Sequence, residues 1–208
     1  PQWYRYKDLI LDVVINNGIT NIGNYAFSDC ENIISATIGD SVTSIGECAF
    51  LRCMKLKSIQ MPQELIAIGN SGFENCRALQ KVALPESVKS IGENAFYCCM
   101  ALTEINLPDS LTSIGQWAFY ACKKLKSIEI PDGVRKLGYA CFGDCTSLSS
   151  VTLPKSITEI EEYVFGDCKR IKKVYYYGTE ESSLEIKVGL YNDKLFSNQW
   201  IYIVDDGK

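Results

Sequence analysis

The sequence contains no histidine and no apolar run that approaches the length of a membrane span. A spanning helix needs about 20 mostly apolar residues, so no membrane insertion is expected within this chain. Without histidine the chain cannot build a Ser-His-Asp triad, a Cys-His pair or a zinc site with imidazole ligands. The 208 residues carry a net charge of −4, which argues against a surface for nucleic acid. With 47% hydrophobic and 22% charged residues, the composition is that of a folded, globular chain.

The dominant feature of the chain is a 23-residue repeat that runs without insertion from Ile19. There are seven copies, and the fourth reads VKSIGENAFYCCMALTEINLPDS. One column holds phenylalanine in every copy: Phe27, Phe50, Phe73, Phe96, Phe119, Phe142 and Phe165. Another holds cysteine in every copy: Cys30, Cys53, Cys76, Cys99, Cys122, Cys145 and Cys168. One copy cannot bury its apolar face alone, so stacked copies are expected to share the continuous core of a solenoid.

Each copy divides into three short segments. A stretch such as 102–107 alternates apolar and polar residues, as a half-buried strand does, and proline follows it in five copies. A V-x-x-I-G segment then predicts a second short strand or a turn, with glycine allowing a tight bend. The A-F-x-x-C segment predicts a short helix, because acidic or amide residues such as Glu93 and Gln116 precede it, as they do at helix N-termini.

The two ends depart from the repeat, as the ends of a solenoid must. Residues 1–18 are expected to form an N-terminal cap with a half repeat, in which Ile10, Val13 and Ile15 occupy strand columns. Residues 19–179 hold the seven repeats. Residues 180–208 are expected to form a C-terminal cap, closed by a strand at 200–204 and followed by a tail at 205–208. The three parts are expected to make one continuous domain.

The unit L-x-x-I-x-L-P-x-S-V-T-x-I-G-x-x-A-F-x-x-C resembles the BspA-like (Treponema-type) leucine-rich repeat, and the closing YYYGTEES resembles the end of the last repeat in such proteins. The resemblance covers roughly residues 10–204. It implies an α/β fold, a right-handed leucine-rich-repeat solenoid with a parallel concave sheet. It also implies a bacterial surface or secreted protein without catalytic residues, with adhesion to host proteins proposed for some members. The sequence departs from the unit at Ala36, Gly39, Glu161, Tyr176 and Tyr177, in the first and last copies, where capping is expected.

Cysteine is abundant, with ten residues, seven of them in one column. Side chains of one column project in parallel from successive turns, so they do not converge as a disulfide requires. A ladder of buried free thiols is therefore favoured, against the usual disulfide bonding of cysteine-rich secreted proteins. Cys141 is expected to join the core, whereas Cys48 and Cys98 are expected to be the more exposed thiols. No C-x-x-C pair is present, so neither a metal site nor another cofactor is expected.

The outward face of the predicted sheet is one candidate binding surface. Its columns are mostly small and polar, and Glu104, Asn106 and Glu129 are the candidate ligand-binding residues on it. The loop after the first strand is acidic in several copies, for example at Asp109 and Asp132. Because the face nearly lacks the aromatic and arginine anchors that interfaces use, the alternative is a plain solvated sheet.

Aromatic side chains on the A-F-x-x-C side form the other candidate surface. Tyr97 and Tyr120 share a column in neighbouring copies, and Trp117 lies three residues before Tyr120, on the same side of the predicted helix. Tyr139 directly follows Gly138, which holds the glycine column of the next copy. Clustered exposed aromatics can anchor a protein or a glycan, whereas the alternative is that these rings only cover the core.

The sequence thus predicts a non-catalytic cell-surface or secreted interaction module, a monomer that adheres to a protein or glycan. The alternative is a passive spacer that displays other domains of a larger surface protein. An enzyme is disfavoured, because without histidine a general base would have to be a carboxylate or lysine in a cleft, and a regular solenoid offers none.

Overall fold

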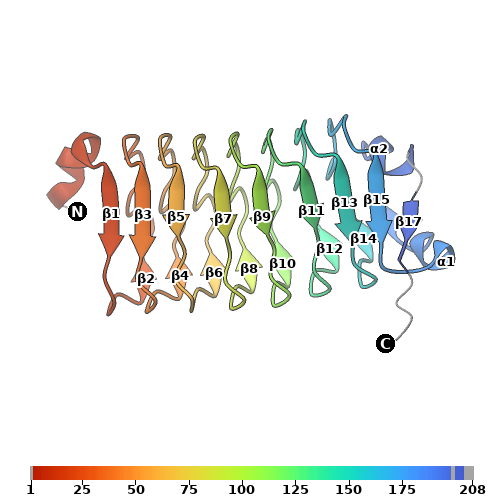
Figure 1. Cartoon of the computed structure of the whole chain (residues 1–208), viewed down its shortest axis with the longest axis horizontal. Coiled ribbons are helices and arrows are strands. Elements are labelled where there is room, and N and C mark those ends of the chain that lie inside the picture. The colour runs from red at the N-terminus through yellow and green to blue at the C-terminus, as the bar shows by residue number, and fades with distance from the viewer. Residues whose placement is uncertain (1, 198–199, 204–208) are drawn as a thin grey trace.

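The computed structural model describes residues 2–197 and 200–203, and it shows an elongated solenoid of parallel strands (Figure 1). The first strand of each turn, or rung, stacks into a long-strand face: β1 (Asp12–Ile15), β3 (Ser35–Ile38), β5 (Ser58–Gln60), β7 (Lys81–Ala83), β9 (Glu104–Asn106), β11 (Ser127–Glu129), β13 (Ser150–Leu153), β15 (Lys173–Tyr176) and β17 (Trp200–Tyr202). Two-residue strands stack into a short-strand face: β2 (Asn21–Ile22), β4 (Ser44–Ile45), β6 (Ala67–Ile68), β8 (Ser90–Ile91), β10 (Ser113–Ile114), β12 (Lys136–Leu137), β14 (Glu159–Ile160) and β16 (Lys187–Val188). The predicted parallel solenoid of 23-residue turns is confirmed, and the predicted tail at 205–208 lies outside the described residues.

Paired strands keep the period of the sequence. Ser35 lies opposite Ser58, and Val82 lies opposite Ile105, each one repeat apart. The central residue of a three-residue strand such as β9 is buried and its neighbours are exposed, so the apolar column faces the core and the polar columns face outward. The alternation in the sequence is therefore expressed as one buried and two outward columns on the long-strand face.

The A-F-x-x-C segments form turns, so the prediction of a short helix in each repeat was wrong. Each repeat has two residues with positive φ on this side, for example Trp117 at 53° and Ala121 at 57°. Their N–H groups donate to the next rung, to the carbonyls of Tyr139 (3.0 Å) and Gly143 (2.8 Å). A right-handed helix excludes such residues and satisfies its donors internally, whereas here the donors join rung to rung. We call this third side of the solenoid the turn face.

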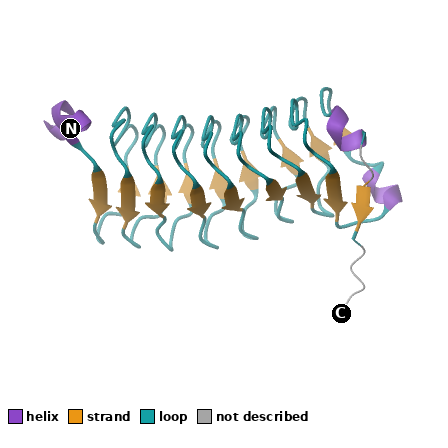
Figure 2. Ribbon diagram, turned by 45° about the horizontal axis from the view of Figure 1, so that its top comes forward, coloured by secondary structure: helices purple, strands orange, loops and turns teal. Residues whose placement is uncertain are grey.

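Helices occur only at the two ends of the described chain (Figure 2). A 3₁₀ helix, η1 (Gln2–Leu9), precedes the first strand, and two short α-helices, α1 (Glu180–Ser183) and α2 (Asp193–Phe196), lie in the last part. The ring of Trp3 stacks on Phe27 with centroids 5.4 Å apart. This contact covers the first ring of the phenylalanine column.

The phenylalanine column is one continuous aromatic stack inside the solenoid. Successive rings lie 5.1 to 5.7 Å apart between centroids and are nearly parallel, from Phe27 to Phe165. The ring of Phe96, in the middle, is 0% exposed. Stacked rings of this kind contribute both buried area and a specific aromatic contact to each rung boundary.

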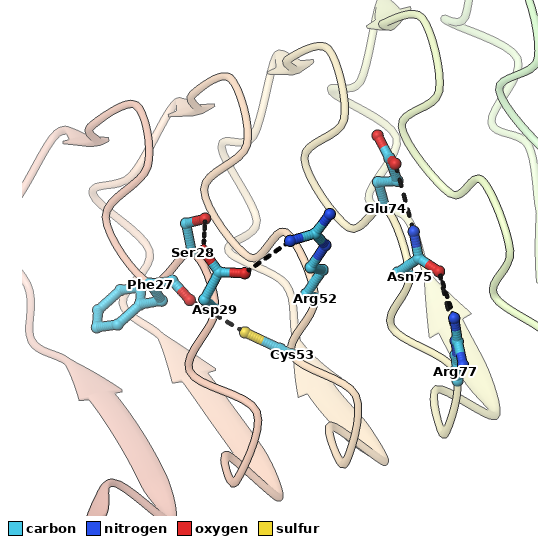
Figure 3. Close-up of polar contacts among 8 residues, drawn as sticks. All are labelled: Phe27, Ser28, Asp29, Arg52, Cys53, Glu74, Asn75 and Arg77. Carbon is cyan, nitrogen blue, oxygen red and sulfur yellow. Dashed lines mark hydrogen bonds and ion pairs between the residues drawn. The ribbon is translucent and has the colours of Figure 1, made fainter. Parts of the chain in front are cut away.

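The cysteine column forms a second buried ladder, which confirms the prediction of free thiols in the core. Figure 3 shows the Cys53 thiol donating to the carbonyl of Phe27, at 3.2 Å, across one rung boundary. The same bond recurs down to Cys168, whose thiol donates to the Phe142 carbonyl at 3.1 Å. All ten cysteines are free. A small side chain that is apolar and still donates a hydrogen bond explains why cysteine, and not alanine, holds this column.

Cys48 and Cys98 are more exposed than the other eight cysteines, as predicted, although Cys48 is still buried. Its side chain is only 9% exposed, because Tyr25 and Ser71 of the adjacent rungs lie against it. Cys98 is half-buried, whereas Cys141 joins the core as predicted. Exposure in one column therefore depends on the size of the neighbours on either side.

Asn192 closes the C-terminal end of the turn face. In the rung before, the N–H of Phe142 donates to the carbonyl of Val164 at 3.0 Å. The equivalent N–H of Phe165 donates to Asn192 Oδ1 at 2.9 Å, while Asn192 Nδ2 donates to the Glu161 carbonyl at 2.8 Å. A side-chain amide thus replaces the missing rung. The predicted closing strand is also present, as β17, and residue 204 lies outside the described residues.

Candidate binding surfaces

The two strand faces are both interrupted at one level of the solenoid. Among the described residues no strand pairing joins β9 to β11 or β10 to β12, although β7–β9, β11–β13, β8–β10 and β12–β14 are paired. The amide of Gly115 donates to the Ile91 carbonyl at 2.9 Å, and Gly138, in the same column, makes no such bond within the described chain. We call this level the seam. β5 and β7 also lack pairing, but β6 and β8 remain joined on the same rungs.

The turn face continues across the seam without a break. The N–H of Phe119 donates to the Cys141 carbonyl at 2.8 Å, and the rings of Phe119 and Phe142 stack with centroids 5.2 Å apart. At the seam, neighbouring rungs are therefore unpaired on both strand faces of the described chain and hydrogen-bonded on the turn face.

Glycine at position 133 lets the chain between the two strands lie close against the preceding rung at the seam. At the turn between the two strands, the Ser110 hydroxyl donates to the Val88 carbonyl of the preceding rung at 2.7 Å, and the Ser156 hydroxyl donates to the Asp132 carbonyl at 2.6 Å. Gly133 occupies that column at the seam and has no hydroxyl to donate. A Cβ at Gly133 would lie 2.2 Å from the Leu111 carbonyl oxygen, so serine does not fit there without a shift of the backbone.

A groove of about 730 Å³ lies over the seam on the long-strand face. The three outward residues predicted from the sequence, Glu104, Asn106 and Glu129, all line it. The acidic loop residues Asp109 and Asp132 line it as well. Its other walls are mainly apolar, with a single lysine: Ile105, Leu107, Ser127, Ile130, Pro131, Pro154, Lys155 and Tyr177. The structure thus brings the predicted outward residues together with loop carboxylates in one cavity.

The side chains on the two walls of this groove differ in their partners. On one wall, Glu104 pairs with Lys81 at 3.0 Å, and the Asn106 amide exchanges two 3.2 Å hydrogen bonds with the backbone of Leu84. Within the described residues the carboxylates of Glu129 and Asp132, on the other wall, have no ion-pair partner. Asn106 therefore fastens β9 to the preceding rung, and the carboxylates without an ion-pair partner lie mainly on the other wall.

The short-strand face has a shallower groove of about 490 Å³ at the same seam, between β10 and β12. A Cβ added at Gly115 would lie 2.4 Å from the preceding rung, whereas one at Gly138 would lie 3.3 Å away, so the rungs are farther apart here. Lys136 lines this groove and pairs with Glu161 at 2.5 Å and Glu159 at 3.4 Å. Its hydrogen bond to Glu161 raises the pKa of the Lys136 ammonium. The Lys136 ammonium is therefore neutralised by carboxylates of the protein itself.

The predicted aromatic residues on the turn face form two separate pairs. Tyr97 and Tyr120 stack with centroids 5.2 Å apart and planes at 11°. Trp117 and Tyr139 meet edge to face at 5.2 Å and 75°. In the described chain no ring contact joins Trp117 to Tyr120, so their expected alignment on one helix face was wrong. The left-handed backbone at Trp117 turns that side chain away from the direction a helix would give it.

Tyr163 extends the tyrosine pair and was missed by the sequence reasoning. The column that holds Tyr97 and Tyr120 continues with Gly143 and Gly166. A Cβ at Gly143 would lie 2.9 Å from the Tyr120 ring and 3.1 Å from the Tyr163 ring, and one at Gly166 would lie 2.4 Å from the Tyr163 ring. The Tyr163 ring thus occupies the space that two absent side chains leave. Two successive glycines in a column of larger residues were the available signal.

Partial burial raises the pKa of the Tyr97 and Tyr120 hydroxyls, and the hydrogen bond to Asp167 raises that of Tyr163 to about 12. These groups therefore stay protonated donors near neutral pH. In the part of the chain that the structure describes, no group of three or more acidic or cysteine side chains is placed to hold a metal ion. No helix in that same part is long and apolar enough to cross a membrane.

The stacked parallel rungs, the single strand per turn on the long face and the leucine- and isoleucine-rich columns define a leucine-rich-repeat protein. The family model for the BspA type leucine rich repeat region matches six copies, over residues 2–104 and 89–192. The chain therefore belongs to this family, as the repeat unit predicted. Solenoids of this class commonly serve as binding scaffolds.

Solved structures share the fold. A leucine-rich repeat protein from Treponema pallidum is 29% identical over 78% of this chain and 78% of its own, with a TM-score of 0.73. One from Bacteroides ovatus is 28% identical over 94% of this chain and 56% of its own, with a TM-score of 0.71. The pneumococcal vaccine antigen PcpA, at 18% identity, 94% and 68% coverage and a TM-score of 0.52, shares the fold alone. A comparison with curated proteins found no significant match.

Proposed function

We propose that this chain is a non-catalytic interaction module, displayed at the cell surface or secreted, and that the groove at the seam binds a polypeptide segment with basic side chains. The observation that carries the proposal is the groove of about 730 Å³ on the outward face, lined by apolar side chains and by four carboxylates. Extended strand faces are the surfaces that solenoids use for partners.

The charge of the groove selects the partner. Glu129 and Asp132 have no ion-pair partner in the described chain, and Lys155 is the one basic residue along the walls. A basic ligand supplies the missing countercharge, accelerates association at low salt and is favoured over acidic competitors. Leu107 and Tyr177 add apolar contact area beside the carboxylates. A lysine- or arginine-containing segment with apolar flanks therefore complements both kinds of wall.

The unpaired strand edges at the seam add main-chain partners. β9 and β11 face each other without a ladder, so their edges retain backbone donors and acceptors that the other strands use for pairing. Cα atoms of β9 and β11 approach within 8 Å, so an extended segment lies over these groups from the groove side and does not enter the sheet between the two strands. The family resemblance supports the surface location, and protease accessibility on intact source cells tests it.

The binding experiment immobilises the chain and measures its affinity for a panel of extracellular-matrix proteins, plasma proteins and glycans. The test variant is Glu129→Gln with Asp132→Asn, which removes two groove carboxylates. The matched control is Glu64→Gln with Glu86→Gln, which removes the same charge from exposed loops of earlier rungs. We expect salt-dependent binding of a basic protein that the groove variant weakens roughly tenfold and the control retains.

Two outcomes contradict the proposal. Equal loss in both double variants would mean that overall charge, and not the groove, drives binding. No binding to any member of the panel would favour a passive spacer that only displays other domains.

A further inference from the structure

The turn face changes character along the solenoid. In the N-terminal rungs it is mainly polar apart from Tyr25: Arg52 pairs with Asp29 at 3.4 Å, and Asn75 contacts Glu74 and Arg77 (Figure 3). In the later rungs the same side carries tyrosine. We call this set the tyrosine face: Tyr97, Tyr120, Tyr163 and Tyr191. Tyr191, at the far end, is 63% exposed and lies 6.0 Å from Tyr163 between ring centroids.

The middle of the tyrosine face is built by two glycines. Gly143 and Gly166 leave the space into which the Tyr163 ring folds, and any Cβ at Gly166 would come within 2.4 Å of that ring. The Tyr163 hydroxyl donates to the carboxylate of Asp167, which fixes the ring at its other end. One side of the ring lies on the backbone, so the opposite side is the one that meets solvent. The ring is therefore held before any ligand arrives, which lowers the entropy cost of binding.

Charged side chains border the rings in matched pairs. Lys123 pairs with Asp144 at 3.4 Å, and Lys169 pairs with Asp167 at 3.2 Å. The hydroxyls of the stacked Tyr97 and Tyr120 are protonated donors near neutral pH, because partial burial raises the pKa of both. The tyrosine face thus combines an apolar ring surface, hydroxyl donors and ion pairs without a strong net charge.

We propose that the tyrosine face is a carbohydrate-binding site. A saccharide is the ligand class that has an apolar C–H face on one side and hydroxyls around its rim, and it carries no charge that the ion pairs would leave unmatched. The aromatic ring provides the amphipathic contact, and the flanking carboxylates and ammonium groups accept from and donate to hydroxyls. The repeated rungs offer similar groups at strand-like spacing, so an oligosaccharide of repeating units matches them better than a single sugar. This site lies on the turn face, and the groove proposed for a polypeptide lies on the long-strand face.

The test applies the whole chain and its variants to an array of immobilised oligosaccharides with neutral hexose, N-acetylhexosamine and uronic acid units. The test variant is Tyr163→Asn, because asparagine tolerates the left-handed backbone at φ 62° and already occupies this column at Asn94. The matched control is Tyr25→Asn, which removes an exposed tyrosine from the same column, at φ 57°. The Tyr25 hydroxyl donates to Glu47 at 3.3 Å. Ser28 lies three residues after Tyr25, whereas Gly166 holds that position after Tyr163.

We expect saturable binding to neutral or N-acetylated oligosaccharides that Tyr163→Asn weakens roughly tenfold and Tyr25→Asn retains. Gly143→Ala, which displaces the Tyr120 and Tyr163 rings, is expected to weaken binding in the same way. Thermal melting confirms that each variant is folded. Binding that survives Tyr163→Asn, equal loss in the control, or no saccharide bound by the wild type would each overturn the proposal. Loss of peptide binding at the groove would leave it unaffected.

Discussion

The buried thiols make this protein sensitive to alkaline pH. Eight cysteines are 0% exposed, and burial raises the thiol pKa far above its usual 9.0 in five of them: Cys76, Cys99, Cys122, Cys141 and Cys145. The folded chain therefore keeps these protons at a pH where the unfolded chain releases them. Because the folded state binds more protons, the free energy of unfolding falls as pH rises above about 9 and is unchanged well below it.

The magnitude follows from the number of thiols. At pH 10, one unit above the ordinary thiol value, ionisation favours the unfolded chain by about 1.4 kcal/mol for each thiol that stays protonated in the folded state. Five such thiols together amount to about 7 kcal/mol, which is comparable to the whole stability of an ordinary domain, about 5–15 kcal/mol. The raised pKa values of the half-buried Tyr97 and Tyr120 act in the same direction.

Guanidinium unfolding at pH 8 and pH 10, with a thiol reductant present, measures this effect. We expect a large fall in the unfolding midpoint at pH 10. The matched variant is Cys141→Ala, since alanine already holds that column at Ala49, Ala95 and Ala118. It removes one titrating thiol, so its loss between the two pH values is expected to be smaller by about 1.4 kcal/mol. Equal midpoints at pH 8 and pH 10 would refute the reasoning, as would rapid labelling of all ten thiols in the folded protein.

Two further predictions concern the stack and the seam. Phe96→Ala opens a cavity in the middle of the aromatic column, so we expect thermal or chemical unfolding to show a loss of about 3–5 kcal/mol, and an unchanged melting curve would contradict the role of the stack. The amides of Arg135 and Gly138 lack the bonds to the preceding rung that Thr112 and Gly115 make, at 2.9 Å each, so hydrogen exchange read by NMR is expected to be faster at the first two. Equal protection of the two pairs would show that the seam is closed in solution.

The period of the sequence was sufficient for the architecture. A 23-residue repeat without insertions places equivalent residues in register on successive turns, so the columns of Phe96 and Cys99 had to stack, and thiols in parallel had no geometry for disulfides. Alternation of apolar and polar residues identified which columns of strands such as β9 face outward. Glu104 and Glu129 were recognisable as outward residues for this reason.

Hydrogen bonds between rungs set the backbone conformation of the turn face. Its local sequence resembles the start of a helix, but the N–H of Trp117 bonds to Tyr139, which lies 22 residues later, and that bond requires a left-handed backbone. The burial of Cys48 likewise depends on Tyr25 and Ser71 above and below it. Local propensity carries no information on such bonds, because their donors and acceptors belong to different turns.

The grouping of candidate residues into sites also needed the tertiary structure. The sequence placed Asn106 and Glu129 in one column, but only the separation of β9 from β11 turns that column into a groove. The same holds for Tyr163, whose ring lies on Gly143 of another rung. A repeat determines which residues share a column, whereas the spacing of neighbouring rungs is set by the packing and hydrogen bonds between them, and these decide where the solenoid opens.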